Sequence, residues 1–158
     1  MSPLDFTIDQ PPKATGPRPP DAALDRGEKT QRKSLSVLLV VEDDPDHRNI
    51  IREILEDEGY QIATASHGGE ALHYLLHGPR PDLILLDLVM PEMDGWAFVS
   101  ELRKSPTLAD ILVVVITQGG NRVLSSAPVS AGYLSKPLDR RKLLETIENC
   151  LWRNGRGQ

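Results

Sequence analysis

Polar side chains that could do chemistry stand directly after four short apolar runs of the sequence. They are Glu42, Asp43, Asp44, Asp87, Thr117 and Lys136. Carboxylates held close together repel one another, and a hard divalent cation such as Mg²⁺, bound through oxygen, compensates their charge. The acids therefore predict a Mg²⁺ site, provided that the fold brings the ends of these runs together.

The threonine and the lysine extend that chemistry to a phosphoryl group. A metal ion and the Lys136 ammonium group neutralise phosphoryl oxygens, the Thr117 hydroxyl donates to one of them, and a carboxylate can serve as nucleophile. Any single acid in such a position is more often a turn former or a helix cap. The prediction rests on the combination, because carboxylates, a hydroxyl and an ammonium group follow four different apolar runs.

Five apolar runs alternate with segments of helical periodicity. The predicted strands are residues 36–41, 60–65, 82–87, 111–117 and 133–135. Strict alternation with continuously apolar strands indicates a parallel sheet that right-handed crossovers build and helices cover on both faces. The sequence therefore predicts an α/β fold with a doubly wound, five-stranded parallel sheet. In such sheets ligands bind at the carboxyl ends of the strands, where the polar residues stand.

Helices are predicted in the connections, and one of them is irregular. The first follows the turn-forming "DDPD" and ends at Gly59, and others cover "GGEALHYLLHG", "GWAFVSELRKS" and the C-terminal apolar stripe. The connection at residues 118–132 instead contains Gly119, Gly120, Pro128 and several serines. Proline breaks a helix interior and glycine adds backbone freedom, so we expect a shortened or irregular fourth helix here.

Composition divides the chain into three parts. Six of its 13 prolines lie before residue 35, in a stretch with almost no bulky apolar residue, so residues 1–34 are predicted to be a disordered extension. Residues 35–153 have the size and apolar content of one domain. Residues 154–158 are predicted to be a short flexible tail without an effector domain.

Charge and hydropathy exclude several classes of protein. The net charge is −5: residues 1–34 carry +1 and the rest of the chain −6, and this acidic body argues against nucleic-acid binding. There is no secretory signal and no apolar run of membrane-spanning length, so a cytoplasmic protein without a membrane partner is expected. Cys150 has no second cysteine to pair with. The four histidines are expected at the surface or at helix caps, because no cysteine or carboxylate accompanies them at metal-binding spacing.

Four stretches resemble the receiver domain of two-component response regulators: "LLVVEDD", "LILLDLVMPEMDGW", "VVVIT" and "YLSKP". The resemblance covers residues 36–151, and "DLVMPEMDG" is a specific signal of the family. The spacing agrees as well, with 44 positions from Asp43 to Asp87 and 30 from Asp87 to Thr117. The resemblance implies a flavodoxin-like receiver fold of the stand-alone, chemotaxis-regulator-like type.

The resemblance also implies roles for the residues at the strand ends. Asp87 would be the phospho-acceptor, and Lys136 would hold a phosphoryl oxygen. Asp43 would bind Mg²⁺ directly and Glu42 through water. The backbone carbonyl of Val89 would be a third metal contact.

Further roles concern switching and the lifetime of the modification. Thr117 corresponds to the switch hydroxyl of the family, and Tyr133 corresponds to the aromatic residue that turns inward in response. The Lys136–Pro137 bond would be cis, which an X–Pro bond tolerates at low cost. The side chains of Val89 and Gly119 cannot hydrogen-bond a hydrolytic water, which predicts a comparatively long-lived phosphoaspartate.

The implied function is that of a response regulator in a two-component system or phosphorelay. A histidine kinase or histidine phosphotransfer protein would phosphorylate Asp87 with Mg²⁺ as cofactor. Too few residues follow the last helix for a separate enzymatic domain, so a monomer or weak homodimer would act on an unidentified downstream protein or relay the phosphoryl group. The alternative is a phosphorylation-independent, receiver-like binding module. A haloacid-dehalogenase-type phosphatase is disfavoured because Val89 stands where that class requires a second aspartate.

Overall fold

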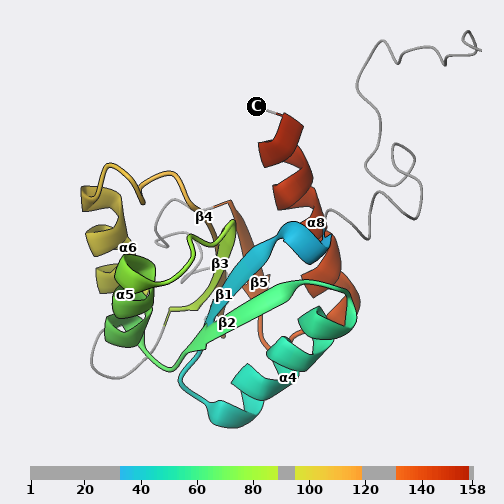
Figure 1. The fold of residues 1–158 in the computed structure, drawn as a ribbon. Helices are drawn as coiled ribbons and strands as arrows, with labels where there is room; N and C mark the ends of the chain where they lie inside the picture. Colours follow the sequence, from blue (N-terminus) through green and yellow to red (C-terminus); the bar gives the residue numbers. More distant parts are fainter. Residues whose placement is uncertain (1–32, 89–94, 119–130, 157–158) are drawn as a thin grey trace, which may run out of the picture.

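The protein contains one five-stranded parallel sheet (Figure 1). The computed structural model describes residues 33–88, 95–118 and 131–156. Its strands are β1 (Val37–Val41), β2 (Gln61–Ala65), β3 (Leu83–Asp87), β4 (Leu112–Thr117) and β5 (Gly132–Ser135). They lie in the order β2-β1-β3-β4-β5, and every neighbouring pair is parallel. The predicted doubly wound sheet is therefore confirmed.

Helices cover both faces of this sheet, as predicted. In the described part of the chain, the helices between and after the strands are α4 (Pro45–Asp57), α5 (Gly68–His77), α6 (Gly95–Lys104) and α8 (Arg140–Arg156). Figure 1 shows α5 and α6 on one side of the strands and α4 and α8 on the other. The predicted irregular fourth helix falls on residues 119–130, which lie outside the described part of the chain.

Alternate residues of the central strands feed two separate core layers. Leu38 and Val40 of β1 are fully buried in the layer that includes Ile51 of α4 and the apolar residues of α8. Leu39 and Val41 are fully buried in the other layer, with α5 and α6. Successive side chains of a strand point to opposite faces, so one continuously apolar run fills both layers.

Local sequence signals explain where α4 begins and ends. The Asp44 side chain caps the helix and accepts hydrogen bonds from two backbone amides of the first turn, at 2.9 and 3.4 Å. Pro45 follows at the first helical position, where its missing N–H costs nothing. Gly59 adopts a φ of 104°, a left-handed conformation that glycine reaches without strain, and the helix ends there as predicted.

Folded contacts begin before the predicted domain start at residue 35. Lys33 lies in a short helical turn, and its ammonium group is 2.9 Å from a carboxylate oxygen of Glu58 and 2.9 Å from one of Glu148. At the other end α8 continues to Arg156. In the described ranges no helix has the length and apolar character needed to cross a membrane.

Candidate functional site

Three carboxylates meet at the carboxyl edge of the sheet and form what we call the acidic pocket: Glu42, Asp43 and Asp87. Glu42 and Asp43 follow β1, and Asp87 ends the adjacent strand β3, in which Leu86 pairs with Val41. One oxygen from each lies within 4.8 Å of the others. Glu42 and Asp87 are buried and Asp43 is half-exposed. The structure thus brings together three of the four acids that the sequence singled out, while the Asp44 side chain caps α4.

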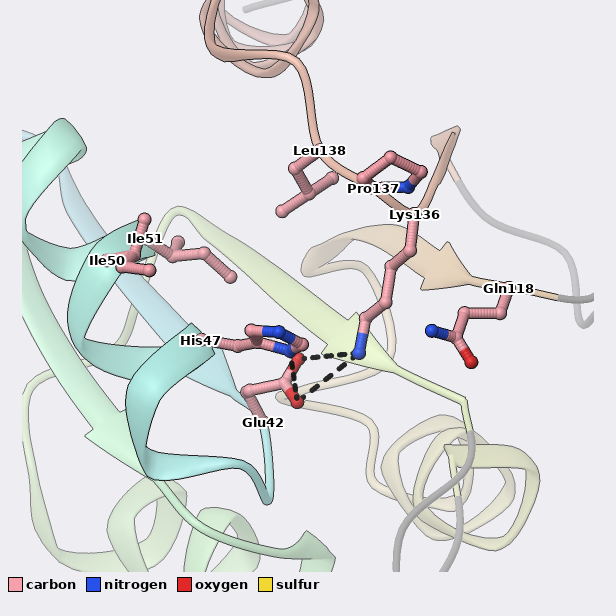
Figure 2. Close-up of a pocket in the computed structure, with 8 residues that line it drawn as sticks. All are labelled: Glu42, His47, Ile50, Ile51, Gln118, Lys136, Pro137 and Leu138. Atoms are coloured by element: carbon pink, nitrogen blue, oxygen red, sulfur yellow. Dashed lines mark hydrogen bonds and ion pairs between the residues drawn. The ribbon is translucent and has the colours of Figure 1, made fainter.

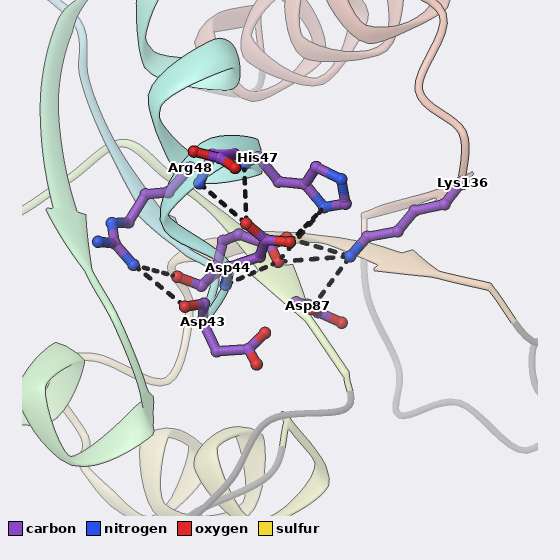
Figure 3. Close-up of polar contacts among 8 residues, drawn as sticks. Asp43, Asp44, His47, Arg48, Asp87 and Lys136 are labelled. Atoms are coloured by element: carbon purple, nitrogen blue, oxygen red, sulfur yellow. Dashed lines mark hydrogen bonds and ion pairs between the residues drawn. The ribbon is translucent and has the colours of Figure 1, made fainter.

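Lys136 reaches into the acidic pocket from the end of β5 (Figure 3). Its Nζ lies 3.3 Å from Oδ2 of Asp87 and 3.3 Å from Oε1 of Glu42. Burial lowers the pKa of this lysine, but the charges of the two carboxylates outweigh burial and raise its pKa overall. The Lys136–Pro137 peptide bond is cis, as expected. The site therefore holds one ammonium group against three carboxylates.

Among the three acids, Glu42 has a buried carboxylate oxygen that makes no hydrogen bond. Its side chain is only 1% exposed, and Oε1 forms no hydrogen bond, although it lies at ion-pair distance from Lys136. Burial and the charge of Asp87 raise the pKa of this carboxyl group, while Lys136 lowers it. A buried carboxylate oxygen that makes no hydrogen bond, beside two more carboxylates, fits a hard divalent cation such as Mg²⁺. The described residues offer the oxygen ligands that such an ion needs.

The two predicted switch residues lie on β4 and β5. Thr117 ends β4 and is 2% exposed, and its carbonyl accepts a hydrogen bond from the Lys136 amide at 2.9 Å. Tyr133 on β5 is 40% exposed, so its ring lies partly in solvent. Their switching roles remain predictions. The contact expected from the Val89 carbonyl lies outside the described residues.

Two residues at this edge were not assigned a role from the sequence. Arg48 Nη1 donates to the backbone carbonyl of Glu42 at 2.8 Å and approaches that of Asp43 at 3.5 Å, so it holds the loop after β1. His47 Nδ1 lies 3.7 Å from Asp44 Oδ2 and 4.0 Å from Glu42 Oε2. His47 is exposed as expected, yet it stands over the acidic pocket. A basic residue on the first helical turn after an acidic loop is the signal that could have indicated this.

Two hollows open beside these groups. One of about 300 Å³ is lined by the acidic pocket, Asp44, His47, Gln118 and Lys136. The other, of about 360 Å³, lies between α4 and the chain after β5, and Figure 2 shows its apolar side formed by Ile50, Ile51 and Leu138. Glu42 and Lys136 line both, so the charged site is open to solvent beside an apolar surface.

Comparison with models of protein families shows to which family the chain belongs. The model of the response regulator receiver domain matches residues 38–148. The chain belongs to the response regulator receiver family. Receiver domains act with histidine kinases, and the acidic pocket is typical of their Mg²⁺ site.

Relatives of this receiver domain occur both alone and within longer proteins. Protein PilH of Pseudomonas aeruginosa is 32% identical over 72% of the chain and 96% of PilH. The probable transcriptional regulator ycf29 of Porphyra purpurea is 36% identical over 74% of the chain, but this covers only 57% of the regulator. The chain therefore spans nearly all of one relative and little more than half of the other.

Solved structures show the same fold. The response regulator TrrA of Thermotoga maritima, solved in complex with Mg²⁺-BeF, is 30% identical, with a TM-score of 0.65 over 73% of this chain and 99% of TrrA. The signal receiver domain of a histidine kinase from Syntrophus aciditrophicus is 34% identical, with a TM-score of 0.67 over 73% of this chain and 89% of that one.

Proposed function

We propose that this receiver takes a phosphoryl group onto Asp87 from a histidine kinase or a histidine phosphotransfer protein. The observation that carries the proposal is the convergence of three carboxylates and Lys136, whose Nζ lies 3.3 Å from Asp87 Oδ2. A carboxylate nucleophile beside a fixed ammonium group and a candidate cation site has the groups that phosphoryl transfer requires.

Asp87 would attack the phosphorus atom of a phosphohistidine through one carboxylate oxygen. An O–P bond forms as the N–P bond breaks, and the donor imidazole keeps the electron pair of that bond and takes up a proton. Lys136 would exchange its ion pair with the free carboxylate for one with a phosphoryl oxygen, since the charge it faces stays negative. The buried Thr117, at the end of the neighbouring strand β4, would donate its hydroxyl to a second phosphoryl oxygen.

Glu42, Asp43 and Asp87 would hold Mg²⁺, and the Val89 carbonyl is proposed as a further ligand. When bound, the ion supplies positive charge that offsets the charge of the phosphoryl oxygens. Arg48 would keep the two acids after β1 in place, because it hydrogen-bonds the backbone carbonyl of Glu42. Output would pass to a downstream protein or a phosphotransfer partner, with Tyr133 turning inward from its half-exposed position.

The test is phosphorylation of the full chain by acetyl phosphate, followed by intact-protein mass spectrometry. We expect wild type to gain the mass of one phosphoryl group only when Mg²⁺ is present. Asp87→Asn should gain none, because an amide oxygen is too weak a nucleophile.

A matched control is Glu101→Gln, which likewise replaces a carboxylate by an amide but lies on α6, where Glu101 pairs with the exposed Lys104. It should be phosphorylated like wild type. Unmodified wild type, or an Asp87→Asn protein that still gains the phosphoryl mass, would refute the proposal and favour a phosphorylation-independent binding module.

A further inference from the structure

Two histidines stand one helical turn apart at the C-terminal end of α5. His73 and His77 are both exposed, and their ring centroids are 4.3 Å apart with ring planes inclined by 37°. Residues four positions apart share one face of a helix. The sequence had suggested ordinary surface residues, because neither histidine has a cysteine or carboxylate at metal-binding spacing. The structure instead makes the two imidazoles partners of each other.

The hydrogen bond of His77 fixes which ring nitrogen is available. His77 Nδ1 lies 2.9 Å from the backbone carbonyl oxygen of His73. A carbonyl oxygen only accepts, so Nδ1 carries the proton, and Nε2 of the neutral ring keeps its lone pair. In metal-binding histidines, the ring nitrogen that does not bind the metal commonly donates its N–H to a hydrogen bond of this kind, which orients the ring.

We propose that His73 and His77 chelate a transition-metal ion of the Cu²⁺, Ni²⁺ or Zn²⁺ class at a site separate from the acidic pocket. These ions prefer imidazole nitrogen, whereas Mg²⁺ prefers oxygen. An ion held about 2.1 Å from one nitrogen of each ring would place the two centroids roughly 5 Å apart. The observed 4.3 Å separation is close to that value, so the two rings are near enough to share one ion.

The surroundings of the pair favour a bound cation. On the opposite face of α5, Ala71 is fully buried and Leu75 is 7% exposed, so packing fixes the helix that carries both rings. His77 is the last residue of α5, and the carboxyl end of a helix carries partial negative charge that attracts cations. The two protein ligands leave coordination positions open for water.

The test is isothermal titration of the untagged full chain with NiCl₂ in excess MgCl₂, which occupies the acidic pocket. His73→Gln and His77→Gln should each weaken Ni²⁺ binding by about a hundredfold, because each leaves one ligand and abolishes chelation. The control is His67→Asn, which removes one histidine from the same helix but preserves the cap that His67 provides to Glu70. Its affinity should equal that of wild type.

A second measurement separates chelation from a change in folding. Circular dichroism should show the same helix content for all variants without metal, and the spin-resonance spectrum of Cu²⁺-loaded wild type should show splitting from two imidazole nitrogens. A variant of either residue that binds Ni²⁺ like wild type, an equal loss in His67→Asn, or splitting from one nitrogen would overturn the proposal.

Discussion

At the scale of single residues, Arg48 sets the position of the acids without touching their side chains. It donates to the backbone carbonyl of Glu42 at 2.8 Å, so the loop between β1 and α4 is tied to the helix that follows it. A charged donor to a carbonyl contributes more than a neutral one. The geometry of Glu42 and Asp43 therefore depends on a basic residue outside the acidic pocket.

Arg48→Ala should weaken Mg²⁺ binding by roughly tenfold, the cost typical of losing a residue that orients metal ligands. The loop after β1 would lose its anchor, and the two acids would sample more conformations. Titration calorimetry with MgCl₂ measures this. Arg141→Ala serves as control, because Arg141 is 84% exposed and its side chain pairs with Glu145 on the surface of α8. An unchanged Mg²⁺ affinity in Arg48→Ala would contradict the expectation.

The sequence indicated some site residues and missed others for a physical reason. Glu42, Asp43, Asp87 and Lys136 each follow an apolar run, and the ends of parallel strands must meet at one edge. Arg48 donates to main-chain carbonyl oxygens. Because every residue has such an oxygen, the sequence contains no particular partner residue that would indicate the role of Arg48. The pairing of the histidines on α5 depends on side-chain rotamers that spacing alone does not determine.

At the scale of elements, Lys33 joins the start of the fold to α4 and α8. It is 16% exposed and lies between Glu58, which follows α4, and Glu148 of α8. Burial lowers the pKa of Lys33, but its hydrogen bonds to the two glutamates and their charges outweigh burial and raise it. Three segments distant in sequence are thus linked through one ammonium group.

Lys33→Met, which keeps the aliphatic stem, should lower the free energy of unfolding by about 1–3 kcal/mol near neutral pH. Lys104→Met is the control: Lys104 and Glu101 form an exposed pair, so the loss should stay within about 0.5 kcal/mol. Urea denaturation measures both.

The stability difference between wild type and Lys33→Met should also depend on pH. Because folding raises the pKa of Lys33, its contribution is complete below the unfolded value of about 10.4 and is lost as the pH rises through the higher folded value. The stability difference between wild type and Lys33→Met should therefore narrow in strongly alkaline solution. A difference that stays constant or widens there would argue against an ionic role.

The helices and strands were largely predictable from the sequence, but the face of the sheet to which each strand side chain points was not. Continuous apolar runs identified β1, β3 and β4, and the turn-forming "DDPD" and Gly59 marked the ends of α4. A run such as "SVLLVV" has no alternation, however, so it cannot say that Leu38 faces α4 and α8 while Leu39 faces α5 and α6. That assignment depends on the strand's pairing within the sheet.

At the scale of the whole molecule, we propose that residues 1–32 add nothing to the stability of the receiver domain. A chain beginning at Lys33 should melt at the same temperature as the full chain. A chain beginning at Ser36 should melt lower, because it lacks the Lys33 ion pairs. Calorimetric scanning of the three proteins checks this, and a lower melting temperature for the chain beginning at Lys33 would show that the extension contributes to the fold.

The length of α4 has a practical consequence for experiments in solution. Its first turn borders the acidic pocket, its last turn leads to Glu58 beside Lys33, and its 13 residues span about 20 Å. A fluorophore or a surface tether on the first residue of a chain that begins at Lys33 would therefore lie at the end of α4 away from Asp87. Kinase encounters could then be followed on immobilised protein with the acidic pocket facing the bulk liquid.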